Sequence, residues 1–332
     1  MLRIYFSADD IARTRLAPAP DQLWELVLSL HMLRGQRGDL LFGDWRRTTG
    51  RRIRTLTAEP RWRRLMALTP TMGYFPDFLT PIAGTQGLEP GLEAIRATPV
   101  AMLDRELRHL AADRRLPDDI APVARGRSDA LVELTDTMRA YHEHAIAPHL
   151  PVIGQATERD RTVRARAMLD GGVEGLLNSL RPLMEWSCGE LRIPGHRPQE
   201  IHLDGRGLLL VPSFFCVNQP MTMFDPDLPP VLIYPVSRVS DTVLLPDRAE
   251  RSALSALIGR TRATLLEMAG TGCCTSDLAR RAGISVPSAS EQAKVLRDAG
   301  LLVSVRDRNK VVHQVTPLGW AMLEHDGQGP PA

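Results

Sequence analysis

The sequence predicts a mainly α-helical fold with small β parts, an α+β chain in two domains. Helical spacing of apolar residues dominates residues 1–180, and four short runs of β-forming residues separated by Pro and Gly follow between residues 190 and 236. The last quarter of the chain reads as two helices followed by a hairpin. Because 332 residues exceed what one hydrophobic core usually serves, we expect a helical domain ending in a small sheet over residues 1–246, a second domain over 247–326 and a disordered tail over 327–332.

The start of the chain carries clear local signals. Residues 1–6 alternate enough to form a short strand, and Ser7 with Asp10 three positions later predicts a capped helix. Residues 20–34 predict a helix with an apolar face that includes Leu23, Trp24 and Val27. Further helices are expected at residues 44–56, 60–68, 100–113, 128–147, 158–170 and 173–180, and strands at 190–193, 200–203, 207–211 and 231–236.

The most specific pattern begins at Thr275, whose hydroxyl and the following acid predict a helix start, and whose helix stops at Gly283. Ser285 caps the next helix, expected over residues 286–299, and Pro287 fits its first turn. Two faces of that helix are expected to differ. Ala289, Ala293 and Leu296 share a buried stripe, and Val286, Ser290 and Lys294 share the outer face.

A hairpin follows this helix. Gly300 has the role of a left-handed C′ residue, and residues 301–305 and 311–315 are apolar or β-branched runs flanking a turn. The turn carries Arg306, Arg308 and Lys310. Three cations on a short tip suit phosphate oxygens or a minor groove, so the whole pattern favours a helix laid in a DNA groove with a basic hairpin beside it.

Residues 275–285, 286–301 and 306–310 resemble the first helix and turn, the recognition helix and the wing of the arsenical-repressor (ArsR) type of winged helix-turn-helix. Residues 257–266 are similar to the leading helix of that family and residues 316–319 to the opening of its closing helix. The long N-terminal region, through residues 77–81 and 207–213, is similar to actinobacterial ArsR-like regulators whose N-terminal domain has no assigned role. The resemblance implies a dimeric transcription regulator that binds operator DNA, with repression as the common mode.

Dimer contacts by this resemblance would come from residues 254–265 and 320–323, although Trp320 and Leu323 equally suit an intrachain core. The recognition helix departs from the family at Glu291 and Gln292, where a basic residue and a histidine are frequent. A Gln side chain can still read adenine, and a Glu side chain can accept from cytosine. The residues that we expect to contact DNA are Thr275, Ser285, Val286, Ser288, Ser290, Glu291, Gln292, Lys294, Arg306, Arg308 and Lys310.

Four cysteines in a chain of this length do not form a disulfide framework, which indicates a reducing, cytoplasmic compartment. Some family members hold Cys-x-Cys at the helix entry, where this chain has Cys274 and Ser276, so we expect no metal. Cys273 lies next to Cys274, and adjacent thiols either are buried without a role or sense arsenite or oxidation. His142 and His144 point to different helix faces, and Pro148 is expected to break the helix before His149, so we expect these histidines to be structural or surface residues.

A domain of this size ahead of a DNA-binding unit is expected to bind an effector. Residues 70–81 concentrate aromatics, Met and Pro outside a regular helix, a composition typical of pocket walls. We expect a hydrophobic small molecule, although aromatics in such a loop also plug the core. The candidate pocket residues are Trp24, Met72, Tyr74, Phe75 and Phe78.

Charge and motifs narrow the functional classes. Residues 251–324 hold ten Lys or Arg against six Asp or Glu, a local charge of +4. The arginine-rich run 34–64 is either a solvated face or a second contact to DNA phosphates. We found no run long enough to span a bilayer, no secretory signal, no Gly-rich phosphate loop and no Gly-x-Ser-x-Gly elbow, so neither an enzyme, a cofactor nor a membrane partner is expected.

Two other functions remain open beside the regulator. The chain could be an enzyme that uses the C-terminal unit for docking, or a protein-interaction element that binds no DNA. The missing catalytic motifs oppose the first alternative, and the basic hairpin opposes the second.

Overall fold

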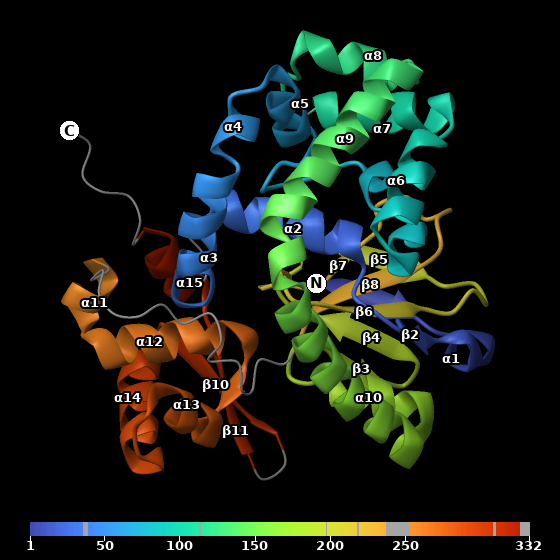
Figure 1. Cartoon of the computed structure of the whole chain (residues 1–332). Coiled ribbons are helices and arrows are strands. Elements are labelled where there is room, and N and C mark those ends of the chain that lie inside the picture. Colours follow the sequence, from blue (N-terminus) through green and yellow to red (C-terminus); the bar gives the residue numbers. More distant parts are fainter. Residues whose placement is uncertain are drawn as a thin grey trace.

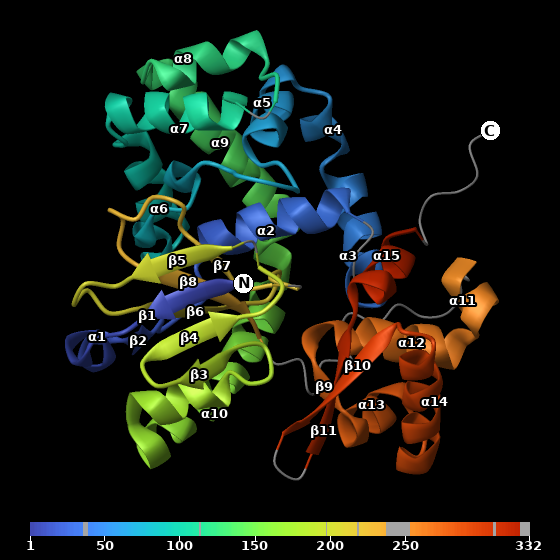
Figure 2. The same ribbon diagram turned by 180° about the vertical axis from the view of Figure 1, so that it is seen from behind.

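A computed structural model describes residues 1–35, 39–112, 114–196, 198–217, 219–236, 253–307 and 310–325. Residues 1–236 form an N-terminal body of helices stacked on two small sheets, and residues 253–325 form a smaller C-terminal unit beside it (Figures 1 and 2). The chain is therefore mainly helical with small β parts, as expected. The expected boundary at residues 246–247 and the expected tail at 327–332 lie outside the described residues.

The first sheet has the N-terminal strand in its interior. Its order is β3-β4-β1-β5, and β1 (Leu2–Tyr5) pairs antiparallel with β4 (Glu190–Ile193) and parallel with β5 (Gln199–His202). Strand β3 (Glu185–Ser187) extends it on the far side of β4. Helix α1 (Ala8–Arg13) follows β1 at once because Ser7 and Asp10 form the expected capping box.

The second sheet has the order β2-β6-β8-β7, in which β2 (Arg15–Leu16), β6 (Leu209–Ser213) and β8 (Val231–Pro235) are parallel. Strand β7 (Met221–Thr222) closes one edge in the antiparallel sense. The expectation of one small sheet at the end of this domain is therefore wrong. Two sheets form because β1 and β2, from the first 16 residues, each pair with strands about 190 residues later in the chain.

Helix α2 (Gln22–Arg34) is capped by Asp21 and lies between the sheets and the upper helices (Figure 1). Most of its residues are buried, and its polar side chains bond to neighbours on two sides. Glu25 accepts the N–H groups of Phe214 and Phe215 at 2.7 and 2.9 Å. Ser29 shares a hydrogen bond of 2.9 Å with the Tyr141 hydroxyl. The other helices of this body are α3 (Asp39–Arg52), α4 (Arg54–Thr57), α5 (Pro60–Leu68), α6 (Leu88–Arg96), α7 (Val100–Ala112), α8 (Ala121–Ala124), α9 (Ser128–Ala145) and α10 (Leu150–Ser179).

The spacing of Gly84, Gly87 and Gly91 does not fit a phosphate-binding loop and predicts ordinary loop glycines, but helix α6 contradicts this prediction for Gly91. Gly91 lies inside the helix, and a Cβ atom there would stand 2.6 Å from the Leu23 side chain. The glycine therefore permits a close helix contact. Helix α10 covers both helices expected at 158–170 and 173–180. It is kinked between them, because Gly171 and Gly172 have non-helical backbone angles.

Three clusters of buried apolar side chains stabilise the chain. The largest joins α2, α5, α7 and α9 to the second sheet, and another lies between the end of α10 and both sheets. The third belongs entirely to the C-terminal unit, from Leu254 to Leu323. No helix among the described residues is long and apolar enough to cross a membrane.

The C-terminal unit begins with α11 (Ala253–Ile258) and α12 (Arg260–Met268), two helices where one was expected, because Gly259 has a φ of 84°. The remaining elements are β9 (Cys273–Cys274), α13 (Thr275–Ala282), α14 (Val286–Asp298), β10 (Leu302–Asp307), β11 (Lys310–Val315) and α15 (Pro317–His325). The expected hairpin is confirmed as β10 and β11, and β9 adds an unexpected third strand beside β11.

Candidate functional site

The turn between α13 and α14 forms as its sequence predicts. Gly283 is left-handed with a φ of 65°, and Ile284 donates its N–H to the Ala279 carbonyl at 3.0 Å. Ser285 caps α14 by accepting the N–H of Ser288 at 3.3 Å. Each of these signals depends only on neighbouring residues, so the local sequence is enough to specify it.

Helix α14 separates its residues into two faces, as expected. Ala289, Ala293 and Leu296 are buried against the rest of the C-terminal unit. On the opposite face Val286 is 50% exposed, and Ser290 and Lys294 are exposed. The helix lies at the outer edge of the molecule, on the side of the C-terminal unit away from the N-terminal body (Figures 1 and 2).

The other expected contact residues of α14 occupy the same helix at different depths. Ser285 and Glu291 are exposed, whereas Ser288 and Gln292 are half-buried. Any partner that approached this face of α14 would therefore reach the Ser285 hydroxyl, the Glu291 carboxylate and the Lys294 ammonium more easily than the amide of Gln292.

Thr275 departs from its expected role as the N-cap of α13. The cap is Cys274, without a side-chain cap bond, and the Thr275 hydroxyl instead bonds Nε2 of His313 at 2.9 Å. The Nδ1 atom of His313 bonds the Ser304 hydroxyl at 2.9 Å, so the buried imidazole ties α13 to both hairpin strands. Burial, with a smaller effect from Arg297, lowers the pKa of His313 below its usual value, which keeps this link neutral.

The hairpin projects beside α13 at the foot of the C-terminal unit (Figure 2). Its backbone register pairs Arg306 with Val311 and Asp307 with Lys310. Arg308 lies outside the described residues. The backbone therefore places Arg306 and Lys310 near the turn, where the sequence predicts contacts to phosphate.

Both cysteines of the vicinal pair are buried thiols, but their surroundings differ. Cys273 accepts a hydrogen bond from Nη1 of Arg281 at 3.2 Å, whereas Cys274 donates to Oδ2 of Asp277 at 3.0 Å. Successive residues of a strand point to opposite faces, and this separates the two sulfurs. No group of three or more His, Cys, Asp or Glu side chains able to hold a metal ion occurs among the described residues. Thiol sensing by this pair stays a prediction.

The predicted effector residues are not gathered around one cavity. Trp24, Tyr74, Phe75 and Phe78 are at most 7% exposed and belong to the main core, where Trp24 meets Phe75 edge to face. Met72 alone is open, at 70% exposure. The packing of these four aromatic side chains therefore matches the alternative interpretation, in which they fill the core of the N-terminal body.

A buried carboxylate pair supports the same loop. Asp77 accepts the N–H groups of Phe224 and Asp225 at 3.0 and 2.8 Å, and Glu106 accepts that of Phe78 at 2.9 Å. Burial, aided by the nearby Asp77 charge, raises the pKa of Glu106 to about 7. These acids connect the loop to α7 and to the chain after β7.

Glu106 is expected to make stability depend on pH. Its pKa of about 7 in the folded chain exceeds the ~4.3 of an unfolded Glu, so its protonation stabilises the fold at low pH, and this contribution is lost as the pH rises through 7. Glu106→Gln cannot ionise but retains an acceptor for Phe78. In urea unfolding measured from about pH 4 to pH 8, the variant should lose free energy of unfolding less steeply with pH than the parent.

The free energy of unfolding of Glu106→Gln should still fall somewhat as the pH rises, because burial also raises the pKa of Asp21 to about 7. The exposed Glu143→Gln change on α9 is the matched control and should leave the profile as it is. Superimposable profiles for Glu106→Gln and the parent would contradict the prediction.

The arginine-rich run 34–64 is partly engaged inside the N-terminal body. Arg34 donates to the Met66 carbonyl at 3.1 Å, and Arg46 donates to that of Met32. Arg64 is buried and pairs with Glu133 at 2.6 Å. The exposed members, which include Arg51 and Arg52, fit a solvated face.

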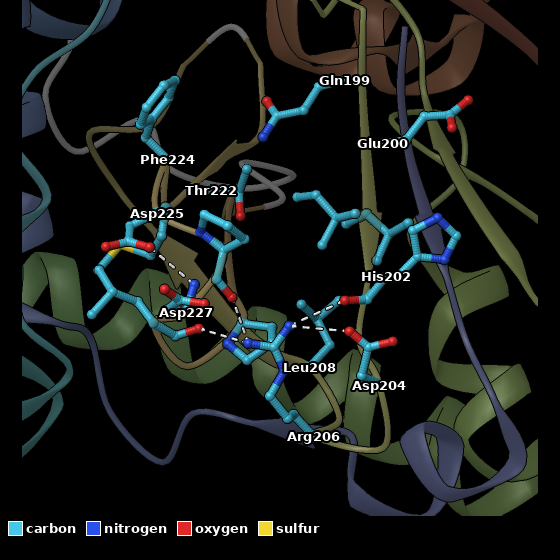
Figure 3. Close-up of a pocket in the computed structure, with 16 residues that line it drawn as sticks. Gln199, Glu200, His202, Asp204, Arg206, Leu208, Thr222, Phe224, Asp225 and Asp227 are labelled. Atoms are coloured by element: carbon cyan, nitrogen blue, oxygen red, sulfur yellow. Dashed lines mark hydrogen bonds and ion pairs between the residues drawn. The ribbon is translucent and has the colours of Figure 1, made fainter. Parts of the chain in front are cut away.

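A groove of about 500 Å³ opens between β5 and the segment 222–230 (Figure 3). Arg206 lies at its base and donates to the carbonyls of Pro226 at 2.6 Å and His202 at 3.1 Å, so its guanidinium fastens the two walls together. Four carboxylates also line the groove and disfavour a polyanion there: Glu200, Asp204, Asp225 and Asp227.

A larger cavity of about 750 Å³ is lined by residues of both the N-terminal body and the C-terminal unit. Met72 lines it, together with its neighbours Pro70, Thr71 and Gly73. The sequence points to this segment but not to the far wall, because Gly270, Gln314 and Trp320 carry no pattern that distinguishes them from ordinary core or loop residues.

Comparison of this chain with protein-family models, with curated proteins and with solved structures finds no match.

Proposed function

We propose that this protein is a sequence-specific transcription regulator that binds double-stranded DNA through a C-terminal winged helix-turn-helix of the ArsR type, most consistent with repression. The observation that carries the proposal is the exposed polar face of α14, which carries Ser290 and Lys294 and faces away from the N-terminal body. A polar helix face that the described elements leave uncovered is the feature that major-groove recognition requires.

The neighbouring elements support this docking. The Ser285 cap leaves the start of α14 at the surface, where residues of a recognition helix contact base edges. The His313 link holds the hairpin against α13, so the wing and the helix would meet DNA as one unit. Gln292 and Glu291 supply the groups for base reading, and Arg306, Arg308 and Lys310 would meet phosphate oxygens.

The regulator is proposed to act as a homodimer, since paired recognition helices read two-fold operators. Leu254 and Leu323 are buried in the core of their own unit, so they do not supply the contact surface. Leu257 on α11 is 74% exposed and Leu318 on α15 is 56% exposed, and these side chains are the apolar groups that a second copy would cover.

Duplex binding tests the proposal directly. Fluorescence anisotropy with a labelled duplex from the region upstream of the protein's own gene should show saturable binding that is at least about 1,000-fold tighter than binding to a shuffled duplex of equal length. Affinity should fall steeply as salt increases, because Lys and Arg contacts release counterions. Indifference to every duplex in dilute buffer would refute the regulator.

A further inference from the structure

The cavity of about 750 Å³ shared by the two parts of the chain has the size of a small-molecule site. The N-terminal body contributes residues from α2, residues 70–73 and the segments around 182, 195 and 217. The C-terminal unit contributes Gly270, Gly272, Gln314, Val315 and Trp320. A molecule in this cavity would therefore touch both parts of the protein at once.

The described residues that line this cavity carry no carboxylate, ammonium or guanidinium group. No Asp, Glu, Lys or Arg occurs among its described lining residues, although these types make up 24% of the sequence. The groove beneath β5 carries four carboxylates and an arginine, so charge is plentiful elsewhere on the surface of the same body. Burying an ionised group without a partner is costly, and an uncharged wall therefore selects against charged ligands.

The described side chains that line the cavity are mainly apolar, with a few polar atoms. Met32, Phe215, Met221 and Trp320 provide soft or aromatic surface. His31 also lines the cavity, and its Nε2 atom is buried without a hydrogen-bond partner among the described residues. Burial lowers the pKa of His31 to about 4, so the ring is neutral near pH 7 and adds no charge to the wall.

Among the described residues, a hydrogen bond and a close glycine contact join the two walls of the cavity. Nε2 of Gln314 donates to the Pro182 carbonyl at 3.1 Å, and a Cβ atom on Gly272 would stand 2.9 Å from the Pro182 ring. Both contacts lie at the cavity itself, since all three residues line it. A ligand that filled the cavity would thus act where the C-terminal unit touches the N-terminal body.

We propose that this cavity binds an uncharged, mainly apolar small molecule with one or two hydrogen-bonding groups, and that the bound molecule changes the affinity of the C-terminal unit for DNA. The regulatory part rests on the proposed function, whereas the binding part does not. A ligand with different affinities for two placements of the C-terminal unit shifts the balance between them, and duplex affinity shifts with it. This site replaces the core-facing aromatics of residues 74–81 as the place where the effector acts, and Met72 is the candidate pocket residue that lines it.

Two dyes with one skeleton test the binding part on the full chain without DNA. Phenylnaphthylamine is neutral, and anilinonaphthalene sulfonate adds one anionic group. Fluorescence titration should show saturable binding of the neutral dye and at least about ten-fold weaker binding of the sulfonate, because the charge would lose its hydration. Equal affinity for the two dyes would overturn the proposal.

Variants on both walls locate the dye. Met72→Glu and Gln314→Glu each bring a carboxylate to the uncharged wall and should weaken the neutral dye about five-fold. Met72 is 70% exposed, so this change leaves the core intact. Met168→Glu, at an exposed methionine on α10, is the matched control and should bind like the parent. Unchanged binding in both cavity variants would refute the site.

Duplex titrations with and without saturating neutral dye test the regulatory part. Duplex affinity should change at least about five-fold in the parent and not in Met72→Glu, and the duplex should change dye affinity by the same factor. An equal duplex affinity with and without bound dye would overturn the regulation. A protein that binds the dye as described but ignores every duplex would instead overturn only the proposed function.

Discussion

The double variant Ser290→Glu, Lys294→Glu is expected to lose at least about 100-fold in duplex affinity, because it places two negative charges on the face of α14 that would meet the phosphates. Both side chains are exposed, and the buried stripe of Ala289, Ala293 and Leu296 is untouched. The fold should therefore survive, as thermal unfolding followed by circular dichroism would report. The loss should appear in anisotropy titrations with the operator duplex and grow as salt is lowered.

Arg166→Glu provides the matched comparison for this charge reversal. Arg166 is exposed on α10 of the N-terminal body, far along the chain from α14. It should change duplex affinity by less than about three-fold, since only the long-range charge differs. Equal losses in the two proteins would mean that α14 is not the recognition element.

The second large effect concerns stability and the junction between α10 and β8. Asp160 is fully buried, pairs with Arg164 at 2.9 Å and accepts the Tyr234 hydroxyl at 2.7 Å. Asp160→Ala leaves the Arg164 guanidinium, itself only 8% exposed, without its carboxylate. We expect a loss of about 3–5 kcal/mol in the free energy of unfolding, because an uncompensated charge stays buried.

The exposed pair Asp104 and Arg108 on α7 has the same residue types, spacing and order. Asp104→Ala should cost less than about 1 kcal/mol, because water and salt screen an exposed ion pair. Urea unfolding of the full chain, followed by circular dichroism, measures both changes. Similar costs for Asp104→Ala and Asp160→Ala would refute the role assigned to burial.

The C-terminal unit was predictable because its signals are local. Gly283 and Gly300 permit a left-handed backbone, Pro287 fixes its own φ, and Ser285 caps α14 through a bond to Ser288. The spacing of the buried stripe Ala289, Ala293 and Leu296 indicates which face of α14 is buried. Thr275 departs from its predicted role because that prediction also used local signals alone. Its hydroxyl has a local role available as an N-cap, but His313, far along the chain, binds it instead.

The N-terminal body was predicted less well because long-range pairing decides it. Nothing near Leu2 or Arg15 indicates that their strands pair with residues almost 200 positions later. Gly91 reads as a loop glycine until Leu23 is placed against it. Tyr74 and Phe78 suit a pocket wall or a core equally well, and only packing separates these alternatives.

By itself, the sequence determined where most helices and strands run, the caps and turn of α13 and α14, and the exposed polar face of α14. Hydrogen bonds between near neighbours and side-chain periodicity are enough for these features. Only the tertiary structure decided three other features: the two sheets, whose strands alternate along the sequence, the buried network of Asp160, Arg164 and Tyr234, and the cavity lined by both parts of the chain. Each brings together residues that are distant in sequence, and their meeting depends on the packing of the whole chain rather than on any local preference.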